Sequence, residues 1–198
     1  QCDVEPKSES VNHQEQQWSG DWGRSYTDRN RVDWRARIPF WKRVIQETGA
    51  RSVTEIGCNC GWNLSAIRRA YPDVQAYGIE INAYAALQAR VAGLLDVRTG
   101  GNDCPPAELV FTVGVLIHQN PESIKAMMER IVAASFQYVL AVEYSADTEQ
   151  EVKYRGMENM LWRRPYGRLY RAMGLKEVDS WPVGEGFDNC QAWLFSKV

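Results

Sequence analysis

The stretch SVTEIGCNCGWNLSAI places glycines and thiols between a β-branched apolar run and an amphipathic segment. Gly57 and Gly61 allow a tight turn and a close approach of the backbone to a ligand, and a helix beginning there would present its positive amino terminus. Three interpretations compete: a simple chain reversal, a metal or redox site on Cys58 and Cys60, or a ligand-binding loop. A metal would need further soft ligands, and Cys104 is the one plausible neighbour, so we expect no metal and favour a packing role for the thiols.

A carboxylate follows the next apolar run. Glu80, in YGIEIN, stands 23 positions after Gly57, where an acid can accept hydrogen bonds from both ribose hydroxyls of an adenosine. The alternative is an acid that caps the helix beginning near Asn82. The glycine spacing is only loosely that of dinucleotide-binding loops, because Asn59 and Trp62 stand where the second and third glycines belong.

Three residues are candidates for acting on a second substrate, because they directly follow later apolar runs. His118 precedes a helix with Pro121 near its start, and its imidazole is suited to act as a base. Glu143 and Tyr144 end the next run, and either could orient an acceptor. The structural alternatives stay open: His118 packs against the helix, and Glu143 pairs with an arginine of the following segment.

Residues 145–172 form a basic, aromatic insertion, in which five arginines stand against Glu158 alone between Tyr154 and Arg171. Arginine binds carboxylate and phosphate through two parallel hydrogen bonds, and aromatic rings can cover a sugar or a base. We expect this insertion to lie on the substrate side, although a solvated helix face explains any single arginine better. The candidate substrate-binding residues are Tyr154, Arg155, Trp162, Arg163 and Arg164.

The amino-terminal region divides at Trp18. Residues 1–17 are polar and without period, which predicts a flexible segment. Residues 18–37 mix aromatic side chains with arginines and predict a lid over the ligand; the alternative is an ordinary amphipathic helix held by Trp18 and Trp22. The candidate ligand contacts in the lid are Tyr26, Arg29 and Asn30.

These residues need elements to position them, and apolar runs alternate with amphipathic stretches from about residue 38 onward. Helices are predicted over 38–50, 63–71, 83–95, 121–135 and 161–174. Strands are predicted over 52–57, 74–81, 96–101, 107–118, 137–145, 176–181 and 190–197. The last two strands follow one another too closely for a crossover helix. The pattern therefore predicts the α/β class, with a Rossmann-like, doubly wound, mostly parallel seven-stranded sheet and an antiparallel C-terminal strand pair.

Four consecutive stretches, EIGCNCGWN, GIEIN, TGGND and ELVFTVGVLIHQNP, resemble the motifs of class I S-adenosylmethionine-dependent methyltransferases. Together with WSGDWGRSYTDRN, VEYS, VKYRG and LWRRPYGRLY, they make the chain similar to the small methylases associated with pseudaminic acid biosynthesis, across roughly residues 18 to 198. The resemblance implies a single methyltransferase domain over 18–198 and S-adenosyl-L-methionine as the cofactor.

The resemblance also implies cofactor contacts after each of the first four strands. The methionine part would be lined by Glu55, Gly57, Cys58 and Gly61. Glu80 would hold the ribose, and Ile81 would lie against the adenine. The adenine edge would be bordered by Gly101, Asn102 and Asp103, and the pocket under the sulfonium would be closed by Thr112, Val113 and Val115. Loops of this kind often have a glycine where this chain has Cys58, Asn59 or Cys60.

The composition is that of one ordinary globular domain, with 198 residues of which 44% are hydrophobic and 24% charged. A net charge of −2 gives no overall attraction to nucleic acid. Five scattered cysteines without a CxxC pair argue against a disulfide scaffold or zinc ribbon. Because no apolar run reaches the ~20 residues of a membrane span and no signal-peptide core is present, we expect a cytoplasmic protein.

We therefore expect a methyltransferase that acts on a small, anionic acceptor, such as an acidic or nucleotide-linked sugar. A second enzymatic interpretation is methylation of a nucleic acid base, with the arginines and tryptophans as a groove. A third is a nicotinamide-dependent oxidoreductase, which the missing third glycine and the terminal strand pair disfavour. The fourth is a non-catalytic scaffold that retains the fold.

Overall fold

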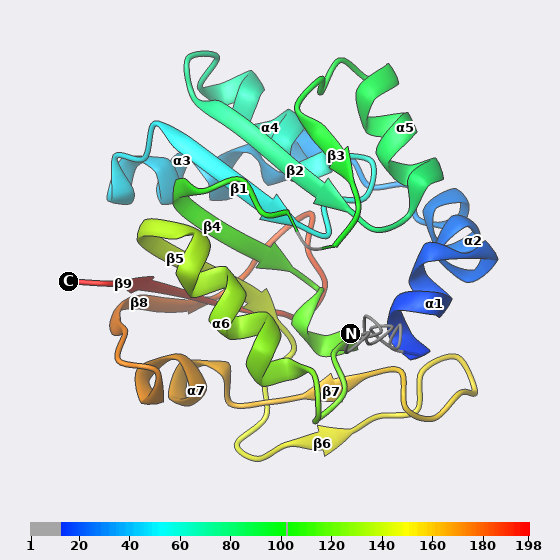
Figure 1. The fold of residues 1–198 in the computed structure, drawn as a ribbon. Coiled ribbons are helices and arrows are strands. Elements are labelled where there is room, and N and C mark those ends of the chain that lie inside the picture. Colours follow the sequence, from blue (N-terminus) through cyan, green and yellow to red (C-terminus); the bar gives the residue numbers. More distant parts are fainter. Residues whose placement is uncertain (1–12, 102) are drawn as a thin grey trace, which may run out of the picture.

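The computed structural model describes residues 13–101 and 103–198, and it is built around a seven-stranded sheet with helices on both faces (Figure 1). The strand order is β3-β2-β1-β4-β5-β9-β8. The strands are β1 Ser52–Ile56, β2 Gln75–Glu80, β3 Val97–Thr99, β4 Ala107–Val113, β5 Ser135–Glu143, β8 Lys176–Pro182 and β9 Gln191–Ser196. The first five strands pair in parallel, whereas β9 is antiparallel to both β5 and β8. The predicted fold class is confirmed.

Seven α-helices lie in the described part of the chain. They are α1 His13–Ser19, α2 Asp21–Arg29, α3 Ile38–Thr48, α4 Trp62–Ala70, α5 Ala83–Val91, α6 Ile124–Ala134 and α7 Tyr166–Ala172. Two short 3₁₀ helices, η1 Trp34–Arg37 and η2 Leu116–His118, precede α3 and follow β4. A two-stranded ribbon, β6 Gln150–Glu151 with β7 Trp162–Arg163, lies apart from the main sheet.

The structure differs from the sequence prediction at three element boundaries. The strand predicted over 107–118 ends at Val113, because Gly114 takes a positive φ of 66° and the chain then turns into η2. The helix predicted over 161–174 begins only at Tyr166, since the preceding residues pair in the ribbon and Pro165 lies at the helix start. Residues 13–17, expected in the flexible segment, belong to α1, and residues 1–12 lie outside the described residues.

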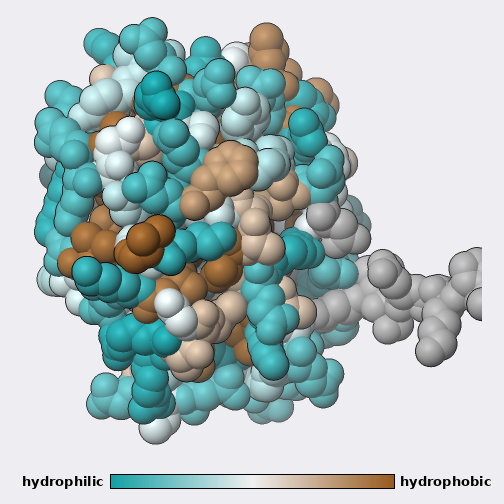
Figure 2. Space-filling view, turned by 60° about the vertical axis from the view of Figure 1, so that its left-hand side comes forward, coloured by the Kyte–Doolittle hydropathy of each residue, from teal (hydrophilic) through white to brown (hydrophobic). Residues whose placement is uncertain are grey.

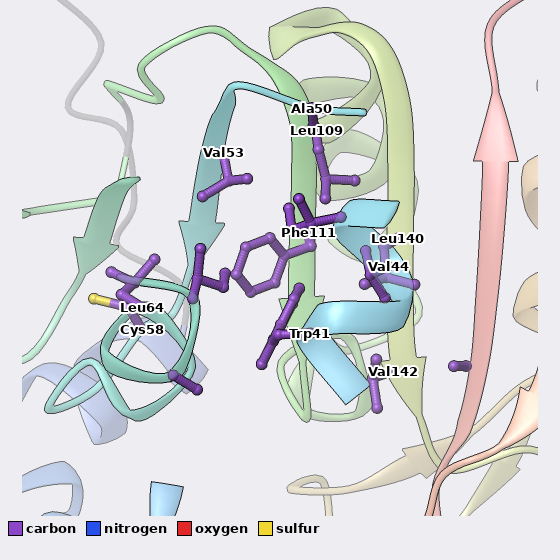
Figure 3. Close-up of a cluster of buried hydrophobic side chains, with 14 of the residues drawn as sticks. Trp41, Val44, Ala50, Val53, Cys58, Leu64, Leu109, Phe111, Leu140 and Val142 are labelled. Atoms are coloured by element: carbon purple, nitrogen blue, oxygen red, sulfur yellow. The ribbon is translucent and has the colours of Figure 1, made fainter. Parts of the chain in front are cut away.

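The sheet separates two hydrophobic clusters, because successive side chains of a strand point to opposite faces. On β4, Leu109 and Phe111 join the cluster under α3, α4 and α5, whereas Val110 joins the cluster under α6 and α7. Figure 3 shows the first cluster, in which Trp41 of α3 lies against Phe111, with ring centroids 4.4 Å apart. Both faces are therefore buried, and the edge formed by the strand ends is where polar side chains can meet.

The surface carries few large apolar side chains in the part of the chain that the structure describes. The face seen in Figure 2 is mostly hydrophilic, with hydrophobic groups gathered toward the middle of the view. The exposed large hydrophobic residues are Leu87, Val91, Leu95, Phe136, Val178 and Val198. Among the described residues, no helix has both the length and the apolar character needed to cross a membrane.

Candidate active site

The carboxyl ends of β1, β2 and β4 point toward the side of the molecule on which α1 and α2 lie (Figure 1). Two cavities are found at this edge of the sheet. Cavity A, of about 120 Å³, is lined by Trp18, Glu80, Ile81, Gly101 and Val115 among others. Cavity B, of about 500 Å³, is lined by Tyr26, Arg37, Glu55, Val113 and Asp188 among others. Gly57 and His118 line both cavities, so these two residues mark the place where they adjoin.

The glycine turn after β1 brings bare backbone between the two cavities. The N–H groups of Gly57 and Cys58 both donate to the carbonyl oxygen of Ile79 on β2, at 2.8 and 3.0 Å. Gly57 has a φ of +71°, and a Cβ at this position would lie 2.5 Å from Cγ2 of Val115. A side chain at Gly57 would therefore collide with Val115 in the loop after β4.

Glu80 ties the glycine turn to the loop after β2. Its Oε2 accepts from the N–H of Asn59 at 2.7 Å, and its Oε1 accepts from the N–H of Asn82 at 2.8 Å. The side chain of Asn82, and not Glu80, caps α5 by accepting from the N–H of Ala85. Glu80 lines cavity A, and burial raises the pKa of its carboxyl group, against the effect of the backbone hydrogen bonds that it accepts.

Glu55 ends one arm of a buried polar network. Its Oε1 accepts from Nδ2 of Asn63 at 2.6 Å, whereas Oε2 is buried with no hydrogen-bond partner in the described residues. The Oδ1 of Asn63 accepts from Nη1 of Arg37 at 2.9 Å and from Nε1 of Trp41 at 3.2 Å. Burial raises the pKa of Glu55 to about 8, against the opposing effects of Asn63 and Arg37. A carboxyl group at a cavity wall with one buried oxygen that lacks a partner can accept a hydrogen bond from a cationic donor.

His118 is held in one tautomer. Its Nδ1 lies 2.7 Å from the carbonyl oxygen of Met160, which can only accept, so the neutral ring carries its proton on Nδ1. The rings of Trp18 and Tyr154 lie at 4.5 and 5.4 Å from it. Burial lowers the pKa of His118 to about 4, against the effect of the Met160 hydrogen bond. At neutral pH the imidazole is therefore uncharged, and Nε2 is left with a free lone pair.

Glu143 and Tyr144, at the end of β5, have different surroundings. Glu143 is fully buried, lies outside the walls of both cavities, and uses its carboxylate to hold the loop after β4. Tyr144 lines cavity B and also cavity C, an open hollow that shares part of its wall with cavity B. The hydroxyl of Tyr144 donates to Oδ2 of Asp188 at 3.1 Å. Burial is the main cause that raises the pKa of this tyrosine, and the negative charge of Asp188 is the next.

The insertion contributes Tyr154 to cavities B and C and Arg163 to cavity C, where Lys153 also lies. Arg155 is exposed beside Tyr154, and its guanidinium lies 5.9 Å from that ring. Trp162 and Arg164 are buried and line none of the three cavities. Arg164 donates to Oε2 of Glu149 at 2.6 Å and to the carbonyl oxygen of Leu116 at 3.1 Å. Two further arginines are engaged outside the cavities, Arg168 with the carbonyl oxygen of Asp147 and Arg171 with Glu177.

The predicted ligand residues thus fall into two groups. Those that line cavity A or B are Tyr26, Asn30, Glu55, Gly57, Cys58, Glu80, Ile81, Gly101, Val113 and Val115. Those that line neither are Arg29, Gly61, Asp103 and Thr112. Arg29 is exposed over the ring of Trp22, and Asp103 pairs with Arg98 at 2.8 Å. Asn102 lies outside the described residues.

Of the two thiols in the turn, Cys58 has little room for chemistry, whereas Cys60 is only partly buried. Cys58 is buried, and its Sγ lies 2.7 Å from the place where a Cβ on Gly78 would be. Gly78 thus makes space for this thiol, and burial raises the pKa of Cys58 well above its usual value. Among the described residues, no group of three or more His, Cys, Asp or Glu side chains is arranged to hold a metal ion.

Several site residues were not singled out from the sequence. Arg37 and Asn63 complete the network around Glu55, and Phe187 and Asp188 form a wall of cavity B. An arginine before a helix and an asparagine within one carry no spacing signal. The hydrogen bond between Arg37 and Gly186 joins residues 149 positions apart, a contact that no local pattern indicates.

Comparison with solved structures places this arrangement in a known fold. No family model matches the chain, and no curated protein matches it in sequence. Burkholderia thailandensis 1,6-didemethyltoxoflavin-N1-methyltransferase, solved with S-adenosylhomocysteine, matches with a TM-score of 0.70 and 17% identity over 98% of this chain and 93% of that one. The chain has the fold of a methyltransferase.

Two further matches support that statement. The sugar N-methyltransferase KedS8 from Streptoalloteichus sp ATCC 53650 has a TM-score of 0.67 and 14% identity, over 90% of this chain and 93% of its own. Mitomycin 7-O-methyltransferase MmcR has a TM-score of 0.61 and 17% identity over 82% of this chain. This chain spans 54% of that protein's length, so it is similar to only part of that protein.

Proposed function

We propose that the protein is an S-adenosyl-L-methionine-dependent methyltransferase acting on a small molecule. The observation that carries the proposal is the placement of two buried carboxyl groups on either side of the Gly57 turn. Glu80 lies at cavity A, and Glu55, with its unpaired Oε2, lies at cavity B. A ligand with a ribose at one end and an amino acid at the other would present hydroxyl donors to one carboxyl group and an ammonium donor to the other.

The chain's own residues fit such a cofactor. Glu80 would accept hydrogen bonds from the two ribose hydroxyls, and Ile81 and Gly101 would lie beside the adenine. Oε2 of Glu55 would accept from the ammonium group, and the guanidinium of Arg37 would bind the carboxylate. The cofactor, when bound, supplies the methyl group on its sulfonium, and the protein aligns the acceptor with it.

The acceptor would enter through cavity C and lie in the part of cavity B bounded by Tyr144, Tyr154 and Asp188. Nε2 of His118 would take the proton that a hydroxyl or amine acceptor loses when its lone pair attacks the methyl carbon. Because Lys153 and Arg163 line cavity C, we propose an anionic acceptor, such as an acidic or nucleotide-linked sugar. Residues 18–37 would act as the lid over this site, through Tyr26 and Asn30.

Calorimetric titration with S-adenosylhomocysteine tests the cofactor assignment without an acceptor. Glu80→Gln keeps the size of the side chain but removes its charge and one acceptor oxygen, so we expect binding to weaken by at least ~10-fold. Asp96→Asn, a matched charge change at an exposed residue outside both cavities, should leave affinity unchanged. A wild-type protein that binds no S-adenosylhomocysteine would end the proposal.

A further inference from the structure

The loop between β8 and β9 forms one wall of cavity B. It is closed by a hydrogen bond from the N–H of Val183 to the carbonyl oxygen of Cys190. Phe187 and Asp188, at its tip, line both cavity B and cavity C, where the acceptor is proposed to bind. The placement of this loop therefore decides the shape of the acceptor site.

One side chain joins this loop to the opposite wall. Nε of Arg37 donates to the carbonyl oxygen of Gly186 at 2.8 Å, and its guanidinium lies 4.4 Å from the centre of the Phe187 ring. On its other side, Nη1 donates to Asn63 at 2.9 Å, and Asn63 in turn donates to Glu55. The same guanidinium thus contacts the acceptor wall and the network around the cofactor carboxyl group.

The packing between the loop and Arg37 is direct. A Cβ added to Gly186 would lie 3.0 Å from Cγ of Arg37 and 3.2 Å from Cβ of Ala36. At Gly186 the backbone of the loop therefore packs directly against Ala36 and Arg37. A shift of Arg37 would move Gly186 with it.

The charge of Arg37 is incompletely matched. The residue is 8% exposed, and it forms no ion pair within residues 13–101 and 103–198. Its Nη2 makes no hydrogen bond with these residues, although Arg37 lines cavity B. The N–H groups of Nη2 can therefore donate charge-assisted hydrogen bonds to a carboxylate in cavity B.

We infer that Arg37 is a positioning residue for the acceptor: a carboxylate bound in cavity B completes its hydrogen bonds and fixes the loop 183–190 as the acceptor-facing wall. This inference rests on the proposed function, in which the methionine part of the cofactor brings that carboxylate. The acceptor site is then complete only on the cofactor-bound enzyme. Binding is ordered, with the cofactor first.

Hydrogen exchange measured by mass spectrometry tests this on the full chain with two commercial probes. S-adenosylhomocysteine carries the carboxylate, and 5′-methylthioadenosine is the same nucleoside thioether without the amino acid part. With the first probe, we expect amide exchange in residues 183–190 to slow by about tenfold, the value of one added charge-assisted hydrogen bond. With the second, exchange around Glu80 should slow while residues 183–190 exchange as in the free protein.

Variants separate positioning from a general structural role. Arg37→Lys keeps a charge but cannot bond Gly186, Asn63 and a carboxylate together, so S-adenosylhomocysteine should no longer slow exchange in 183–190. Arg35→Ala, at an exposed arginine of the same 3₁₀ helix, should behave as wild type. If wild type binds S-adenosylhomocysteine but the loop exchanges unchanged, or if Arg37→Lys keeps the full effect, the inference fails and the cofactor assignment stands. If neither probe binds, both fail.

Discussion

The hydroxyl of Thr112 on β4 donates a 2.8 Å hydrogen bond to the carboxylate of Glu143 on β5, and neither residue is exposed to solvent. The same carboxylate accepts from the backbone N–H groups of Val115, Leu116 and Ile117. Glu143 therefore holds the turn that carries His118 between the cavities. We propose that its role is to position this loop, in place of the direct contact with the acceptor expected from the sequence.

This arrangement predicts unequal losses of stability for the two partners. Glu143→Ala leaves three backbone N–H groups without their acceptor and should lower the free energy of unfolding by about 3 kcal/mol or more. Thr112→Val removes one hydrogen bond at nearly constant volume and should cost about 1 kcal/mol. Urea denaturation of both variants checks this. Equal losses would show that the N–H groups find other partners and that Glu143 does not hold the loop.

The parts of this site that could be predicted from the sequence are those fixed by one strand and its next turn. Glu80 lies at the end of β2, which the apolar pattern of that strand predicts. Gly57 lies in the turn after β1, which the glycine itself predicts. The end of β4 was missed because the apolar run continues past Gly114, whose positive φ ends the strand, and because the turn that follows is held by Glu143, a residue of another strand. Arg37 and Asp188 were missed because they meet cavity B through contacts between distant segments.

The raised pKa of Glu55 leads us to expect that the protein releases a proton when the cofactor binds. Burial raises its pKa to about 8, so at pH 7 the free protein holds this carboxyl group mostly protonated. An ammonium group beside Oε2 favours the ionised form, which lowers the pKa and expels the proton. The affinity for S-adenosylhomocysteine should therefore rise with pH up to about 8.

Calorimetry in two buffers of different ionisation enthalpy, phosphate and Tris, counts that proton. At pH 7 the wild-type protein should release between half a proton and one proton per ligand, roughly as a pKa near 8 requires. Glu55→Gln keeps an acceptor oxygen but cannot ionise, so its heats should agree in both buffers. The same release from Glu55→Gln would assign the proton to another group.

The lowered pKa of His118 leads us to expect that the folded protein loses stability in acid. Its folded pKa of about 4 lies below the ordinary value of 6.5, so between these values the unfolded chain binds a proton that the folded protein excludes. Stability from this group is complete above pH 6.5 and falls as the pH drops toward 4, by about 3 kcal/mol in total. His118→Asn keeps a donor to Met160 but does not titrate. Its stability relative to wild type should improve by that amount between pH 7 and 4, as measured by urea denaturation, and a constant difference would contradict the buried neutral imidazole.

The last prediction concerns the crowding of Gly57 against Val115. Gly57→Ala combines an unfavourable positive φ, about 1 kcal/mol, with a Cβ 2.5 Å from Cγ2 of Val115, which adds ~1–3 kcal/mol of overpacking. Gly93→Ala is the matched control, because Gly93 has a φ of +92° but nothing within 4 Å of its added Cβ, so it should cost only about 1 kcal/mol. In a double-mutant cycle, Val115→Ala should relieve the contact and recover about 1–2 kcal/mol in the Gly57→Ala background. Additive losses in that cycle would mean that the two loops do not touch at this point.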